Sequence, residues 1–192
     1  MTKEEKGKFR QYERLLLSYA DFKHAGSVSS YIIRKGLHDA SCQEPHFLLE
    51  ALNCSMIISY CRPFSGNDKR TSKNIPDLPG NFVNVLNSEE RDIHQVVMND
   101  RNRVLAHSDS EALDVLPVVW KINDDNEMIT PVKNWGLSPL TREATIIFSS
   151  AAKKLFQEVL RRREVLEPEL KKYLKVVDTD GMSKIMGGEV PS

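Results

Sequence analysis

The sequence predicts an all-α bundle of four to five helices, with a small β-hairpin or extended insertion before the last long helix. Apolar residues recur at helical spacing over most of the chain, and capping residues precede several of these stretches. One short region instead alternates around turn residues, as strands do. The 192 residues, 40% of them hydrophobic, are enough to bury one core. We expect a single helical domain over residues 1–176 and a weakly ordered tail over 177–192.

The amino-acid composition limits the kinds of partner and cofactor that we expect. Lys+Arg and Asp+Glu both number 27, so the net charge is zero and any contact with RNA must be local. The three cysteines contain no C-x-x-C pair, which argues against a disulfide framework or a zinc site and favours buried thiols in a reducing cytosol. No apolar signal core or membrane-length stretch is present. We therefore expect a cytoplasmic protein with no membrane contact, no metal and no cofactor.

Two helices are predicted in the first third of the chain. The first covers residues 4 to about 20, and the pattern resumes from Val28 to Arg34 before Gly36, as one kinked helix or two short ones. Its predicted core face is Phe9, Tyr12, Leu16, Tyr19 and Ala20. The second begins at the Ser41–Glu44 capping box before Pro45 and ends at Cys61, before Arg62-Pro63. Because it is apolar on most sides, we expect it to be the central, most buried helix.

A polar loop, 63–80, follows, and it is either functional or a solvated connector. Residues 81–86 predict one helical turn.

The hairpin is predicted from Leu113 to Val132 around the turn 123–126, and Pro117 and Pro131 favour edge strands. Ser138-Pro139 then opens the last helix, which extends to Leu166 or, with a kink at Pro168, to Leu174. Its predicted core face is Ala144, Ile147, Phe148, Ala151, Leu155 and Val159. The three arginines 161–163 suit the helix dipole near its end, and a phosphate contact is the second interpretation.

The stretch from Asn87 to Asp109 reads as one helix that begins on an Asn87–Glu90 capping box. Its apolar stripe consists of Ile93, Val97 and Val104. Asp100 and His107 fall on that stripe, where further apolar residues are expected. On an ideal helix Arg101 lies about 120° from His107, so the two do not share a face.

The segment Arg101-Asn102-Arg103-Val104-Leu105-Ala106-His107-Ser108-Asp109 resembles the signature of HEPN domains, an arginine followed after four to six residues by a histidine. It is most similar to the abortive-infection U-type branch, whose helix and loop before the motif also resemble residues 51–67. The order of helices agrees over residues 8 to 166, apart from the inserted hairpin.

The resemblance implies a bundle that dimerises, with two motifs facing one groove, and metal-independent cleavage of RNA as part of antiviral defence or a toxin–antitoxin pair. His107 would be the general acid/base, Arg101 the phosphate and transition-state clamp, and Asn102 would orient His107 or the scissile phosphate. Imidazole titrates near neutrality and guanidinium binds phosphate in a bidentate way, so the residue types suit this chemistry. Asp100, Arg103, Ser108 and Asp109 are candidate substrate contacts, and Arg62 is another.

Two alternatives remain open. Arg101 and His107 would also suit a salt bridge and a helix C-cap. A HEPN-like module could instead bind a nucleotide or a protein partner, such as an antitoxin, without cutting RNA. The other histidines are expected to be ordinary surface or interface residues: His24, His38, His46 and His94.

Overall fold

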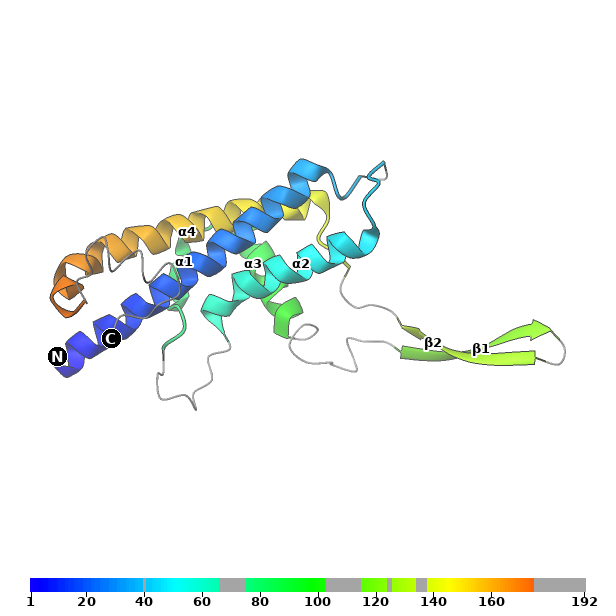
Figure 1. The fold of residues 1–192 in the computed structure, drawn as a ribbon, viewed down its shortest axis with the longest axis horizontal. Helices are drawn as coiled ribbons and strands as arrows, with labels where there is room; N and C mark the ends of the chain where they lie inside the picture. Colours follow the sequence, from blue (N-terminus) through cyan, green and yellow to red (C-terminus); the bar gives the residue numbers. More distant parts are fainter. Residues whose placement is uncertain (40, 66–74, 103–114, 124–125, 134–137, 175–192) are drawn as a thin grey trace, which may run out of the picture.

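The computed structural model describes residues 1–39, 41–65, 75–102, 115–123, 126–133 and 138–174. Within these ranges it is an all-α bundle with one β-hairpin, as predicted (Figure 1). The elements are α1 (Lys3–Lys35), α2 (His46–Cys61), α3 (Ser88–Asp100), β1 (Val115–Asn123), β2 (Asn126–Lys133) and α4 (Arg142–Leu170). Short 3₁₀ turns cover Arg62–Phe64, Gly80–Val85 and Lys171–Tyr173, so the predicted turn at 81–86 is confirmed.

Helix α1 is one continuous helix and the centre of the bundle. Thr2 caps its start, and Gly36, in a left-handed conformation with φ of 60°, ends it. It lies antiparallel to α4 along most of its length, and α2 packs against another of its sides (Figure 1). The prediction that α2 would be central and most buried is wrong, because Phe47 and Ile58 of α2 are exposed.

The buried face of α1 differs from the predicted one. Leu15 is fully buried, whereas Leu16 is 41% exposed. From Leu15 the buried positions alternate by three and four residues, through Leu15, Ser18, Phe22, Ala25, Ser29 and Ile32. Consecutive leucines at 15–17 fit several stripes, and the stripe with small residues is the one buried, because small side chains let α1 and α4 approach closely. A Cβ added to Gly26 would lie 4.0 Å from the Cβ of Ala152.

The starts of α2 and α4 were predicted several residues too early. Helix α2 begins after Pro45, without a side-chain cap, so the Ser41 capping box does not form. Helix α4 begins on Thr141, whose hydroxyl accepts a hydrogen bond from the Ala144 amide, and not at Ser138-Pro139. Its core face is confirmed at the fully buried Phe148, Ala151, Leu155 and Val159.

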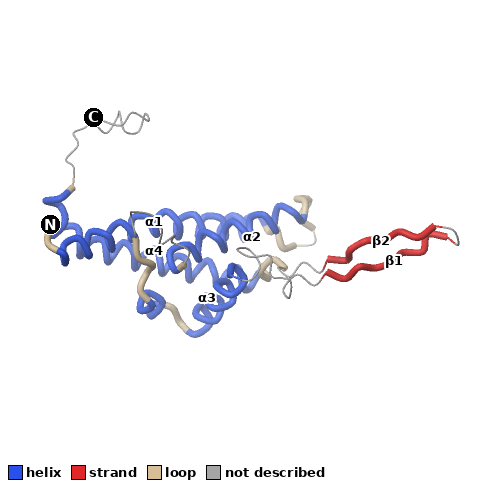
Figure 2. Tube along the Cα trace, turned by 90° about the horizontal axis from the view of Figure 1, so that it is seen from below, coloured by secondary structure: helices blue, strands red, loops and turns tan. Residues whose placement is uncertain are grey.

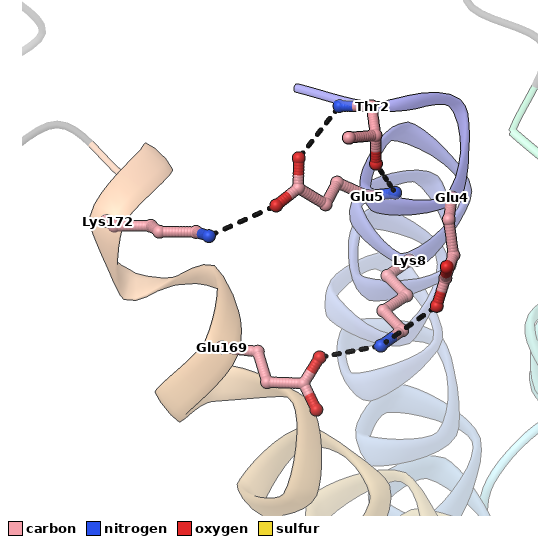
Figure 3. Close-up of polar contacts among 6 residues, drawn as sticks. All are labelled: Thr2, Glu4, Glu5, Lys8, Glu169 and Lys172. Atoms are coloured by element: carbon pink, nitrogen blue, oxygen red, sulfur yellow. Dashed lines mark hydrogen bonds and ion pairs between the residues drawn. The ribbon is translucent and has the colours of Figure 1, made fainter.

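Polar contacts join the end of α4 to the start of α1. The Lys8 ammonium lies 2.8 Å from Glu169, and the Lys172 ammonium lies 3.1 Å from Glu5 (Figure 3). Glu5 also completes the capping box with Thr2. These contacts follow because α4 continues through Pro168 to Leu170 and a 3₁₀ turn extends it to Tyr173, so the helix ends between the two predicted ends, Leu166 and Leu174.

The hairpin extends away from one end of the bundle (Figures 1 and 2). Its strands are antiparallel, with Pro117 directly opposite Pro131. Proline cannot donate a ladder hydrogen bond, and in a two-stranded sheet both strands are edges, so the predicted edge placement is confirmed. The tail predicted over 177–192 lies outside the described residues, as do 66–74 of the polar loop. No helix in the described ranges is long and apolar enough to cross a membrane.

Candidate functional site

The capping box predicted at the start of α3 is present. The Asn87 side chain accepts a hydrogen bond from the Glu90 amide at 2.9 Å, and the Glu90 carboxylate accepts one from the Asn87 amide at 2.8 Å. Two N–H groups at the helix start are thereby satisfied. The Glu90 carboxylate also accepts hydrogen bonds from Ser150 and Lys154 of α4, each at 2.8 Å. Glu90 thus fixes α3 against α4, a role that the capping pattern did not reveal.

The predicted stripe of α3 is confirmed as far as the helix is described. Val97 is fully buried, Ile93 is partly buried, and Asp100 continues the same face. Burial raises the pKa of the Asp100 carboxyl above its ordinary value. A carboxyl that is more easily protonated than usual therefore stands beside Arg101 at the end of α3.

Arg101 and Asn102 continue α3 in a wider, π-type turn. The Arg101 guanidinium donates to the Asn102 side-chain oxygen at 3.0 Å. Asn102 is exposed and Arg101 is partly exposed. Arg101 forms no ion pair with another residue that the structure describes. The salt-bridge alternative therefore gains no support from the described residues.

The end of α2 lies beside the end of α3. The Cys61 thiol donates to the Val97 carbonyl at 3.5 Å. Burial raises the pKa of Cys61 to about 12, with a smaller lowering by Arg101 and a smaller raising by Asp100. Cys61 is therefore a buried, protonated thiol, as predicted, and both Asp100 and Arg101 lie close enough to affect it. No group of three metal-binding side chains occurs among the described residues.

Arg62, the next residue, pairs with a buried carboxylate of α1. The Arg62 guanidinium donates to Asp21 of α1 at 2.8 Å. Asp21 is only 8% exposed, and Arg14, two turns earlier on α1, is 2% exposed and donates to the Pro76 carbonyl at 2.7 Å. Sequence analysis missed Asp21 and Arg14. Their seven-residue spacing, which places both on one helix face, was the available signal.

His94 is not the surface residue that was predicted. Its ring packs edge-on against Phe64 and Tyr60, with centroid distances of 4.9 and 5.7 Å. The Tyr60 hydroxyl and His94 Nδ1 form a hydrogen bond at 3.1 Å. Burial lowers the pKa of His94. The histidine of α3 is thus part of the aromatic core that supports the helix.

This burial predicts a loss of stability between pH 7 and pH 5. The unfolded histidine binds its proton near its ordinary pKa, about 6.5, and the folded one only at lower pH. Acid therefore favours the unfolded chain as pH falls through this window. Urea unfolding at pH 7.5 and 5.5 should show a smaller pH-dependent loss for His94→Gln, which keeps an acceptor for Tyr60 but does not titrate. Equal losses in both proteins would contradict the prediction.

The other predicted site residues lie outside the described residues: Arg103, His107, Ser108 and Asp109. The structure therefore brings together Asp100, Arg101 and Asn102 with the end of α2, and the relation of Arg101 to His107 stays a prediction. Comparison of the chain with protein-family models, curated protein sequences and solved structures found no match in any of the three. The resemblance to HEPN domains likewise stays a prediction.

Proposed function

We propose that this protein is a metal-independent endoribonuclease of the HEPN type, which cleaves single-stranded RNA with Arg101, Asn102 and His107. The observation that carries the proposal is the Arg-Asn-x₄-His motif, whose first two residues stand at the end of α3. There the Arg101 guanidinium has no carboxylate partner among the described residues and the Asn102 side chain is exposed. This is what a phosphate-binding arginine requires.

The reaction needs only groups that the motif supplies. The ribose 2′-oxygen attacks the adjacent phosphorus and loses its proton to a base, while the 5′-oxygen leaves and takes a proton from an acid. The products are a 2′,3′-cyclic phosphate and a 5′-hydroxyl. His107 would serve as base or acid, and Arg101 would stabilise the added negative charge on the phosphorane. In a homodimer, two copies of His107 would supply both roles.

The test is cleavage of labelled single-stranded RNA in EDTA by the wild type and two variants. His107→Ala should lower the rate about 10²–10⁴-fold, the usual contribution of general acid–base catalysis. Arg101→Ala should lower it about 10²–10³-fold, as for loss of one transition-state donor. The matched control is Arg91→Ala, an exposed arginine about three turns earlier on α3, which should cut like the wild type.

The products add a chemical check, because a cyclic phosphate end requires the 2′-hydroxyl and a DNA strand of the same sequence should stay intact. If the wild type leaves RNA uncut, or the two variants cut as fast as it does, the nuclease assignment is wrong. An inactive protein that still binds a nucleotide or a protein partner, and loses that ligand on mutation of Arg101, would support the non-catalytic alternative.

A further inference from the structure

A second candidate site lies between α1 and α4, on a different face of α4 from α3. It is a cleft of about 490 Å³ lined by Phe22, Lys23, Gly26, Ser27, Ser30, Arg34, Ser149, Lys153 and Phe156. Ser150 and Lys154, which contact Glu90 of α3, are the next residues along α4. One step along a helix turns the side chain by about 100°. The α1–α4 cleft is therefore separate from the contact that α3 makes with α4.

The charges around the cleft have one sign. Lys23, Arg34 and Lys153 line it, and no carboxylate does. Lys23 and Arg34 lie near tyrosine rings, and none of the three forms an ion pair with another described residue. Elsewhere in the bundle about half of the described cations are paired with acids, as at Lys8, Arg62, Arg142, Lys154, Arg161, Arg162 and Arg163. In a chain of zero net charge, this gathering of unpaired cations points to an anionic ligand.

Pairing also decides the role of the three consecutive arginines. Arg161 and Arg162 each lie 2.7 Å from Glu158, and Arg163 lies 2.9 Å from Glu167. The Arg162 guanidinium also covers the Phe82 ring at 4.1 Å. They stand about two turns before the end of α4, so these ion pairs, and not the helix dipole, account for their positions. Lys23, Arg34 and Lys153 differ from them, because they line the α1–α4 cleft without an ion pair to another described residue.

The cleft is elongated along the helices. Lys23, Ser27, Ser30 and Arg34 follow one stripe of α1 at intervals of four, three and four residues. At 1.5 Å per residue the stripe spans roughly 16 Å. Ser149, Lys153 and Phe156 form the same kind of stripe on α4. Cations in a line, with hydroxyl groups between them, suit the repeated phosphates of a chain better than one compact anion.

An aromatic pair stands at the Lys23 end of the cleft. Phe156 is partly buried, and its ring lies 5.0 Å from that of Tyr19. Single-stranded nucleic acids combine phosphates with flat bases, and proteins that bind them combine cations with aromatic side chains. The α1–α4 cleft therefore combines cations, which suit phosphates, with an aromatic ring, which suits a base.

We propose that the α1–α4 cleft binds the backbone of a single-stranded nucleic acid. Lys23, Lys153 and Arg34 contact successive phosphates, and Phe156 receives a base. The cleft does not depend on the nuclease activity, because a protein that binds a strand without cutting it would need the same groove. If the strand is RNA that the protein also cuts, the cleft holds it at a distance from Arg101.

The test is fluorescence anisotropy with a labelled 2′-O-methyl RNA of about 12 nucleotides, a length within the range of single-strand sites. This RNA lacks the nucleophile and cannot be cleaved. The cleft variant carries Lys23→Glu, Arg34→Glu and Lys153→Glu. The control carries Lys3→Glu, Lys6→Glu and Lys171→Glu, an equal change in net charge at exposed lysines that form no ion pair with another described residue.

The cleft variant should bind at least tenfold more weakly, and its slope of log K against log salt should be smaller by about 2, since each lost phosphate contact removes about 0.7. The control should keep most of the affinity for the RNA. Circular dichroism checks folding, and glutamine at the three cleft positions replaces glutamate if the reversal unfolds the protein.

Equal losses in the cleft and control variants would overturn the proposal, because the binding would then follow net charge and not the cleft. Absence of binding by the wild type would overturn it as well. Displacement of the RNA by ATP at equal concentration would assign the cleft to free nucleotides and not to a strand. Loss of RNA cleavage without loss of RNA binding would count only against the roles of Arg101 and His107. The nuclease proposal and the cleft proposal can therefore fail separately.

Discussion

Phe148→Ala is expected to lower the free energy of unfolding by about 4 kcal/mol, because truncation of a fully buried phenylalanine typically costs about 3–5 kcal/mol. Phe148 is 0% exposed, and its ring lies 4.8 Å from that of Tyr60. Tyr60 in turn contacts Phe22 of α1 and His94 of α3. Loss of the Phe148 ring would leave a cavity where all four helices meet, and no single helix could move to fill it.

The measurement is urea unfolding at pH 7.5, with Phe47→Ala as the control. Phe47 is the same residue type on α2 but is 68% exposed, so its removal should change the stability by less than about 0.5 kcal/mol. The melting temperature of Phe148→Ala should fall by roughly 8–16 °C, given about 2–4 °C for each kcal/mol in a chain of this size. Similar effects of the two substitutions would contradict the assignment of the core.

A local sequence pattern predicted the start of α3 correctly, because one pair of residues forms its whole cap. The Asn87–Glu90 box formed because both side chains are within reach of the free amides, whatever the rest of the chain does. The Ser41–Glu44 box did not form. Its pattern precedes Pro45, which is itself the N-cap residue, and the helix begins at His46 without a side-chain cap. Both patterns are signals of a helix start, and no further local signal distinguishes between them.

The packing face of α1 depended on a partner that local patterns do not show. Leucines at 15–17 allow several stripes, and α4 selects the one through Leu15, Ala25 and Ser29. The α1–α4 cleft was missed for the same reason. Lys23 and Lys153 are far apart in the chain, and each alone looks like an ordinary charge on a helix surface. Only their shared cleft, without a carboxylate, distinguishes them.

The motif itself could be recognised from sequence, because its residues are close together in the chain. Arg101 and Asn102 stand at the end of α3, as predicted, and continue it in the wider π-type turn. What supports them could not be predicted. Asp21 anchors Arg62 from inside the bundle, and Glu90 joins α3 to α4 across sixty residues of sequence. Both are charged residues that the sequence would place at the surface.

Glu90→Ala is expected to lower the free energy of unfolding by about 3 kcal/mol. The Glu90 carboxylate is 2% exposed and accepts hydrogen bonds from Asn87, Ser150 and Lys154. A hydrogen bond to a charged group contributes about 1.5–3 kcal/mol, and loss of a helix cap costs about 1 kcal/mol. These terms are not additive, because the Lys154 ammonium is partly exposed and regains water.

The pH dependence of Glu90 has a defined sign. Burial alone would raise its pKa, but hydrogen bonds from Lys154, the Asn87 amide and Ser150 outweigh burial and lower it. The stabilisation by the ionised Glu90 carboxylate is therefore complete above the pKa of glutamate in the unfolded chain, about 4.3. It is lost as the pH falls through the lower pKa of Glu90 in the folded protein. Glu90→Gln should lose less stability than the wild type over this range, because it has no proton to bind.

The same substitution tests whether α3 must be fixed to α4 for the proposed activity. Glu90 is three turns before Arg101, so its effect on cleavage would act through the position of α3 alone. In Glu90→Ala we expect faster hydrogen exchange of the α3 amides and a lower cleavage rate, both partly restored in Glu90→Gln. The control is Glu89→Ala, an exposed neighbour that should change neither. Unchanged exchange in Glu90→Ala would show that apolar packing, through Val97 and Ile93, suffices to hold α3 and the arginine at its end.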